Sequence, residues 1–403
     1  MRRELAGALA AVWLLAAAPG AGAQETGGVA TLPAIGPHWV WVPDWVFAHS
    51  LLFDGDSGKV LGMLDSGVSG TPKLPLLARA RGEIYSVDIA YARGRRGARS
   101  DFVTIYDAES LGVVGEVALE HPTADSVTAI AHAALLDGDR FLLVFSQFPS
   151  ALVSVVDLEE RRVAGEVPIA GCAGVYPAGP QRFATLCGDG RVLVAELGPT
   201  GAPAGTTHSE PFFDVIEDPV GMAGARLGAA WVFVSFAGRV HVVDLAGDRP
   251  RPEPPWSLLD EEARTAGWLP GGHQPVALHR DSGRLYVVMH QGGAGSHKEP
   301  GPEIWGYDLA QRTRIARIEV PNLTAAFLAP LLGIEAGGFT AWLLRQVTPS
   351  PGAHSIAVTQ DERPLLFARN TGLGVVAVLD AASGEHLRNL EEAGTSGPTL
   401  GVP

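Results

Sequence analysis

The stretch Val153-Ser-Val-Val-Asp157-Leu-Glu-Glu-Arg-Arg-Val163 has the pattern of a β-hairpin: strand-forming residues end in an acidic residue, a polar turn follows, and a second strand begins. The chain contains seven such stretches, and most of them show the second strand clearly. The acidic residues of the other six are Asp54, Asp107, Glu196, Asp244, Asp308 and Asp380. One hairpin per roughly 40–70 residues is typical of a β-propeller, in which each repeat forms a four-stranded blade. The sequence therefore predicts an all-β, seven-bladed β-propeller.

Length and composition agree with one large domain of this kind. The chain has 403 residues, 46% of them hydrophobic, with 50 glycines and 30 prolines. This composition provides a large core and many tight turns. A propeller counts as one domain because its repeats bury their apolar faces against each other. We expect the propeller to span residues 38–403 and a small, polar, flexible arm to occupy residues 24–37.

The first 23 residues have the pattern of a cleavable signal peptide. Arg2 and Arg3 are followed by an apolar run over residues 5–17 and by the small-residue site Ala21-Gly-Ala23. The alternative is a membrane anchor, but the run is short for a span. We therefore expect an exported chain that begins at Gln24 and has no membrane span.

The charge of the chain excludes one class of partner. The formal net charge is −14, and it becomes −15 without residues 1–23, which contain two arginines and Glu4. A strongly acidic protein is repelled by the phosphates of nucleic acids. We therefore expect no nucleic-acid partner.

Two stretches interrupt the strand pattern. The first, Ser257–Gly267, has the pattern of a short helix with Ser257 as its N-cap. The second is an apolar insertion over residues 321–347, broken by Pro330 and by Gly337-Gly338. Its large apolar residues are Leu323, Phe327, Leu328, Leu331, Leu332, Ile334, Phe339, Trp342, Leu343 and Leu344. Such a segment must be covered by something, and two alternatives stay open: a surface for a partner, or a helical hairpin packed on its own blade.

The chain has two cysteines, Cys172 and Cys187. In an exported protein an isolated pair favours a disulfide. The stretch between them contains a Pro/Gly turn, so a hairpin would bring the two sulfurs together. A metal site would need further ligands nearby, and none stands at the usual spacing.

No catalytic or metal-binding motif is evident in the sequence. The candidate metal ligands are His273, His279, His290 and His297. No pair of them has the spacing of a zinc finger or of a His-Glu-x-x-His motif. We therefore expect no metal site, no cofactor and no catalytic residue in this chain itself.

Several stretches, in collinear order over almost the whole mature chain, resemble one known family. The most specific is Gly267-Trp-Leu-Pro-Gly-Gly-His-Gln-Pro-Val-Ala-Leu-His279. The others are Val40-Trp-Val-Pro-Asp44, Phe53–Asp65, Arg95–Asp107, the Cys172 and Cys187 pair, His297-Lys298 and Asp361–Phe367. On these residues the chain resembles the heavy, β-propeller subunit of methylamine dehydrogenase and of its aromatic amine dehydrogenase relative.

The resemblance implies a function in which this chain carries no cofactor. In that family a small, disulfide-rich light subunit holds tryptophan tryptophylquinone, which oxidises a primary amine to an aldehyde and ammonia. Electrons pass to a copper protein (a cupredoxin) or a cytochrome, and two heavy and two light chains form a periplasmic heterotetramer. The resemblance also implies that a phenylalanine in the loop after Asp44 borders the amine-access channel, and Phe47 is the candidate.

Two features depart from the family pattern: the loop after Asp44 is shorter, and the insertion at residues 321–347 is additional. These departures leave the substrate and the partner open. Two functions of other classes also stay open. One is a non-enzymatic secreted propeller that binds a protein or ligand at its central face. The other is a propeller hydrolase or lactonase with a metal in its channel.

Overall fold

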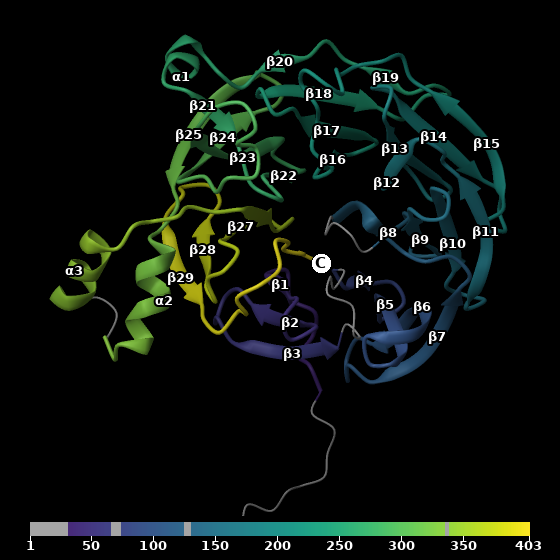
Figure 1. Cartoon of the computed structure of the whole chain (residues 1–403), viewed down its shortest axis with the longest axis horizontal. Coiled ribbons are helices and arrows are strands. Elements are labelled where there is room, and N and C mark those ends of the chain that lie inside the picture. Colours follow the sequence, from purple (N-terminus) through teal and green to yellow (C-terminus); the bar gives the residue numbers. More distant parts are fainter. Residues whose placement is uncertain (1–30, 66–73, 125–129, 335–337) are drawn as a thin grey trace, which may run out of the picture. The chain divides into compact units, whose positions relative to one another are not determined.

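The computed structural model describes residues 31–65, 74–124, 130–334 and 338–403. They form seven antiparallel sheets arranged as blades around a common centre, a seven-bladed β-propeller (Figure 1). The predicted fold class is therefore confirmed. The proposed signal peptide lies outside the described residues. Among the described residues, no helix has the length and apolar character needed to cross a membrane.

The blades follow one another in sequence order. Blade 1 contains β1 (Trp39–Asp44), β2 (His49–Asp54) and β3 (Val60–Asp65). Blade 2 contains β4 (Leu76–Ala78), β5 (Glu83–Arg93), β6 (Arg96–Asp107) and β7 (Val113–Leu119). Blade 3 contains β8 (Ala133–Leu135), β9 (Phe141–Ser146), β10 (Leu152–Asp157) and β11 (Arg162–Pro168), preceded by the 3-10 turn η1 (Ile130–His132). Blade 4 contains β12 (Cys172–Pro177), β13 (Arg182–Cys187), β14 (Val192–Leu197) and β15 (Pro203–His208).

Blades 5 and 6 are slightly elaborated. Blade 5 contains β16 (Ala225–Leu227), β17 (Ala230–Val234), β18 (Arg239–Asp244), β19 (Arg251–Pro252) and β20 (Trp256–Ser257). Blade 6 contains β21 (Trp268–Pro270), β22 (Val276–His279), β23 (Arg284–Gln291), β24 (Glu303–Asp308) and β25 (Thr313–Glu319). Blade 7 contains β26 (Ser355–Val358), β27 (Leu365–Arg369), β28 (Val376–Asp380) and β29 (His386–Leu390).

The repeated acidic residues form the turns that the sequence predicts. Asp157 at the end of β10 accepts hydrogen bonds from the N–H groups of Glu159 (3.0 Å) and Glu160 (3.1 Å). Such side-chain bonds to the following backbone stabilise a tight turn without a second strand having to form first. Glu196 is different: its strand continues to Leu197, and the turn there is closed by main-chain bonds such as Gly201 N to Gly198 O (2.9 Å).

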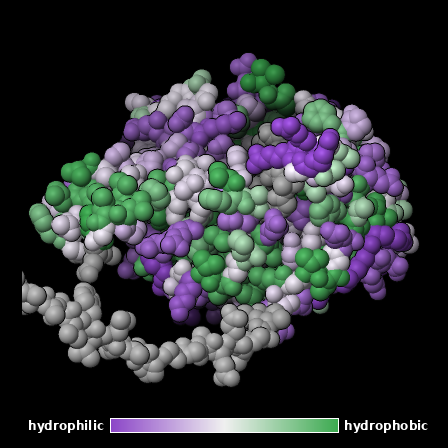
Figure 2. Space-filling view, turned by 60° about the horizontal axis from the view of Figure 1, so that its bottom comes forward, coloured by the Kyte–Doolittle hydropathy of each residue, from purple (hydrophilic) through white to green (hydrophobic). Residues whose placement is uncertain are grey.

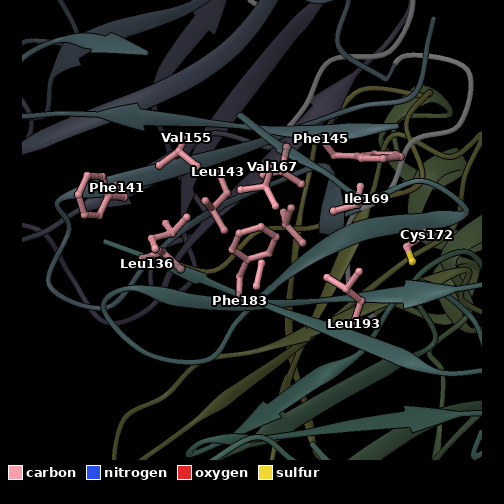
Figure 3. Packing of buried hydrophobic residues seen from close by; sticks show 14 of the residues in the cluster. Leu136, Phe141, Leu143, Phe145, Val155, Val167, Ile169, Cys172, Phe183 and Leu193 are labelled. Atoms are coloured by element: carbon pink, nitrogen blue, oxygen red, sulfur yellow. The ribbon is translucent and has the colours of Figure 1, made fainter. Parts of the chain in front are cut away.

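The core lies between neighbouring blades. Figure 3 shows the packing between blades 3 and 4, where Leu143 and Val155 of one blade meet Phe183 and Leu193 of the next. All four side chains are buried. Each blade thus buries a face that it could not cover alone, which is why the repeats form one domain.

The ends of the chain close the ring. Trp41 in β1 and Gly401 exchange two main-chain hydrogen bonds, of 2.7 and 3.0 Å, so the last residues run beside blade 1. Near the start, residues 31–37 are the described part of the expected arm. Leu32 and Ile35 pack against the core cluster of blades 1 and 2, and Leu32 N donates to Glu109 O (2.7 Å).

The insertion forms two helices, α2 (Leu323–Leu331) and α3 (Phe339–Val347). Asn322 ties the two ends of this hairpin together: its side chain accepts from Ala325 N (2.9 Å) and donates to Thr348 O (2.9 Å). Leu323 is fully buried in the core of blades 6 and 7, and Phe327 packs against the same core. The hairpin therefore does pack on its own blade, through one face of α2.

Much of the rest of the hairpin is exposed, so of the two expected forms of cover its own blade provides only part. The exposed residues are Leu331, Leu332, Phe339, Trp342, Leu343 and Val347. Figure 2 shows a hydrophobic patch at the left, on the side where Figure 1 places α2 and α3.

The other helix, α1 (Glu261–Thr265), begins later than predicted. Its N-cap is Asp260, whose carboxylate accepts from Ala263 N (2.8 Å), and not Ser257. The Ser257 hydroxyl instead binds the N–H of Leu259 (3.0 Å), because residues 256–257 pair with β18 and hold Ser257 in a strand.

Candidate functional site at the mouth of the central channel

A cavity opens at one end of the ring's centre, where loops from several blades converge. We call it the mouth cavity. Its volume is about 360 Å³. A second cavity of about 360 Å³, whose lining includes residues of β4, β8, β16, β22 and β26, shares Ile130, Gln274 and Val276 with it. The mouth cavity is lined mainly by apolar residues and by basic ones. The lining includes Trp45, Met222, Phe236, His273, His297, Lys298 and Thr399.

Main-chain hydrogen bonds hold the basic loops close together. Gly272 N donates to His297 O (3.1 Å), and His273 N donates to His354 O (2.7 Å). Gly272 has φ of +117°, and a Cβ at this position would lie 2.3 Å from His354 O, so only glycine permits this approach. The histidines are therefore placed by the backbone and not by their own charges.

The rings in the cavity are ordered by stacking. The His297 imidazole lies flat on the Phe236 ring, with centroids 3.9 Å apart and an interplanar angle of 7°. The rings of His273 and His354 stack at 5.5 Å, and His354 Nδ1 accepts from Thr371 N (3.1 Å).

The electrostatics of the cavity disfavour further positive charge. Partial burial, with nearby Lys298 and His297, lowers the pKa of His273. Burial, followed by the proximity of Lys298, lowers the pKa of His297. Burial and the neighbouring His273 lower the pKa of His354 to about 4. These imidazoles are therefore neutral at pH 7, and Lys298 carries the charge.

Two polar atoms of the lining have no hydrogen-bond partner within the described part of the chain. They are the indole nitrogen of Trp45 and the hydroxyl of Thr399, and Thr399 is 2% exposed. A buried donor without an acceptor costs about 1–3 kcal/mol. The cavity thus offers donors that the folded chain leaves unsatisfied.

The loop between β1 and β2 stands beside this cavity and is held by Asp44. The buried carboxylate accepts from Val46 N (2.8 Å), Phe47 N (3.0 Å), Thr395 N (2.9 Å) and Ser396 Oγ (2.7 Å). Burial alone would raise the pKa of Asp44, but these hydrogen bonds outweigh it and lower the pKa.

The clamped loop presents Phe47 to solvent. Its side chain is 68% exposed and stacks on the His49 ring at 5.9 Å. Phe47 does not belong to the lining of the mouth cavity; Trp45, two residues earlier, does.

The four histidines that were considered as candidate metal ligands lie in three different places. His273 and His297 lie at the mouth cavity, His279 bonds to Ser282 Oγ (2.8 Å), and His290 bonds to Ser296 Oγ (2.8 Å).

Within the described residues, one set of three histidine or acidic residues has donor atoms within 4.8 Å of one another: Glu120, His121 and Glu166. His121 Nε2 lies 3.1 Å from Glu166 Oε2, so a hydrogen bond between blades 2 and 3 accounts for this set.

Cys172 and Cys187 are joined by a disulfide, with the sulfurs 2.00 Å apart. They are directly opposite each other on β12 and β13, the first two strands of blade 4. The hairpin that the Pro/Gly turn indicated is therefore the one that the disulfide closes.

Sequence reasoning missed part of the cavity. His273 and the His297-Lys298 pair stood in stretches that resembled the family. Phe236 and His354 carried no local signal, because they come from blades 5 and 7 and meet His297 and His273 only when the ring closes. The bonds from Asp44 to Thr395 and Ser396 likewise had no signal in the sequence, since these two partners lie about 350 positions away.

The fold and this site define the chain as a seven-bladed propeller with an ordered, apolar and basic mouth. A family model described as methylamine dehydrogenase heavy chain (MADH) matches residues 40–324. The chain belongs to this family. The match ends at the start of α2, so most of the helical hairpin lies beyond it.

Curated relatives agree with this assignment at modest identity. The methylamine dehydrogenase heavy chain of Paracoccus versutus is 27% identical over 357 residues, which cover 87% of this chain and 75% of the relative. That of Methylophilus methylotrophus is 24% identical and covers 92% of this chain and 85% of the relative.

Solved structures show similarity of fold alone. The dihydro-heme d1 dehydrogenase NirN, in complex with DHE, aligns with a TM-score of 0.55 at 18% identity over 92% of this chain and 77% of that chain. A functionally unknown protein from Desulfotomaculum acetoxidans aligns with a TM-score of 0.52 at 11% identity over 91% of this chain and 98% of that chain.

Proposed function

We propose that this chain is the large, non-catalytic subunit of a periplasmic amine dehydrogenase that depends on tryptophan tryptophylquinone. The quinone, carried by a small light subunit, supplies the oxidation of a primary amine to an aldehyde and ammonia. The electrons pass to a cupredoxin or a cytochrome. Two large and two small chains form the heterotetramer. The observation that carries this proposal is the family match over residues 40–324.

The role of this chain is to position the small subunit and to shape the path of the amine. The loop between β1 and β2 supports this role, because it presents Val46 and Phe47, which are 65% and 68% exposed, from a rigid base. Exposed apolar side chains on an ordered loop are what a docking or gating element needs, since little entropy is lost when a partner covers them. Phe47 is our candidate for the residue that borders the amine entrance.

Purification with and without the partner tests the assembly. The chain purified from its native source should carry a small, cysteine-rich subunit with quinone absorbance and should oxidise primary amines with an artificial electron acceptor. The same chain expressed alone should be inactive. Amine turnover by the single chain contradicts its non-catalytic role. A natively purified chain without any partner favours the non-enzymatic binding propeller instead.

Substitution of Phe47 tests the gate. In the assembled enzyme, Phe47→Ala should change the ratio of kcat/KM between a bulky and a small primary amine on the order of tenfold, because it widens an apolar entrance. Phe148→Ala, which removes another exposed phenylalanine from the loop between β9 and β10, serves as the control and should leave the ratio unchanged. An unchanged ratio in Phe47→Ala excludes Phe47 as the gate.

A further inference from the structure

We propose that the mouth cavity binds a carboxylate group attached to an apolar body. The only ionisable side chains in its lining are basic: His273, His297 and Lys298. The chain as a whole is acidic, with a formal net charge of −14 and three lysines. A basic cavity in an acidic protein is a local feature that the composition does not explain, and it selects for a negative group.

The groups that would meet the carboxylate are donors without acceptors. Lys298 makes no ion pair with any residue that the structure describes, and its side chain is exposed at the cavity. The Thr399 hydroxyl and the Trp45 indole N–H, both in the lining, also lack partners there. A carboxylate oxygen accepts from ammonium, hydroxyl and N–H groups alike, and bonds to a charged donor are the strongest of these.

The arrangement is preorganised for such a ligand. The main-chain bonds from Gly272 to His297 and from His273 to His354 hold both imidazoles at the cavity beside Lys298. Burial, and then the proximity of Lys298, lowers the pKa of both His273 and His297. A bound anion would neutralise the charge of Lys298 without any movement of the loops. Perturbed basic groups in a cleft are typical of a binding site.

The apolar part of the lining determines what kind of body the carboxylate is attached to. Phe236 and Met222 stand beside the basic groups, so a hydrophobic body has a surface to cover. A protonated primary amine, by contrast, is repelled by Lys298. If the proposed function holds, this cavity is distinct from the path of the amine.

Two sources can supply the same chemistry: a small organic acid, or an acidic side chain of the docked small subunit. The first arm of the test needs no partner and is independent of the proposed function. Calorimetric titration of the full chain with benzoate should show saturable binding. Benzamide, which has the same shape without the charge, should bind at least about tenfold more weakly.

Variants assign the binding to this cavity. Lys298→Gln should weaken benzoate binding about tenfold, and Thr399→Val should weaken it less, because it removes a neutral donor. Lys59→Gln, at an exposed lysine in the turn between β2 and β3, is the matched control and should bind benzoate like the parent. The proposal is overturned if benzoate does not bind, if benzamide binds equally well, or if Lys298→Gln has no effect.

The second arm identifies the source. If the small subunit supplies the carboxylate, saturating benzoate and Lys298→Gln should both weaken its association with this chain, while Lys59→Gln should not. If association is unaffected and benzoate still binds, the ligand is a free organic acid. A failure of the proposed function leaves the first arm intact, so the two results are distinguishable.

Discussion

The carboxylate of Asp44 joins two segments from opposite ends of the chain, because it accepts hydrogen bonds from the N–H groups of residues 46 and 47, from the N–H of Thr395 and from the hydroxyl of Ser396. Asp44→Ala should cost about 2–4 kcal/mol of unfolding free energy, since four donors lose their acceptor in a buried place. The folded-state pKa of Asp44 is lowered, so this contribution is complete above its unfolded pKa and disappears as the pH falls through the folded value. Urea denaturation should therefore show a large difference between parent and variant at pH 7 and a smaller one below about pH 4.

Asp281→Ala, at an exposed aspartate, is the control and should change stability by no more than about 0.5 kcal/mol at either pH. A difference for Asp44→Ala that is equal at pH 7 and pH 3 would falsify the assignment of this carboxylate as a charged acceptor.

Residue chemistry could be predicted from the sequence where the partners are local. The turn aspartates bond to the next few N–H groups, and the cysteines close one hairpin, so short-range pattern was sufficient. It failed for the N-cap of α1, because pairing of Trp256 and Ser257 with β18 competes with the helix for Ser257. Local propensity is overridden when a tertiary contact is stronger.

At the scale of elements, the hairpin of α2 and α3 has one covered and one uncovered side. Substitutions on the two sides of α2 should therefore differ in their effect on the free energy of unfolding. Leu323 is 0% exposed and Leu331 is 69% exposed. Leu323→Ala should cost about 2–5 kcal/mol because it leaves a cavity in the core of blades 6 and 7. Leu331→Ala should change stability by less than about 0.5 kcal/mol.

Chemical denaturation of the isolated chain measures both variants under one condition. Equal costs would show that the hairpin is not seated through α2 as described. The apolar sequence indicated two arms around Gly337-Gly338, and two helices are present. The sequence could not indicate which side of α2 faces the blade, because α2 is apolar nearly all round. That side is determined by contacts with the neighbouring core.

At the scale of the whole molecule, the number of blades followed from the repeated hairpins, while the closure of the ring did not. The sequence offered no repeat at the end of the chain to mark residues 399–403 as the partner of β1. Their role comes from three contacts: the Trp41–Gly401 pair, the burial of Leu400, and the Gln274 side chain, which bonds to both Leu400 N and Leu400 O at 3.0 Å.

Arg369 also takes part in this closure, and its contacts add to the stability that removal of the last residues should cost. Arg369 is 1% exposed, burial lowers its pKa to about 10, and its guanidinium donates to the carbonyl oxygens of Pro43 (2.9 Å), Ser396 (2.9 Å) and Thr399 (3.3 Å). Removal of residues 399–403 should therefore cost more than about 4 kcal/mol, since a buried leucine and several buried hydrogen bonds are lost together. That is a large part of the roughly 5–15 kcal/mol that stabilises a domain. Denaturant unfolding and limited proteolysis should show an opened ring, whereas removal of Pro403 alone, which none of these contacts involves, should have little effect. Equal stability of the two truncated chains would mean that the ring closes without residues 399–402.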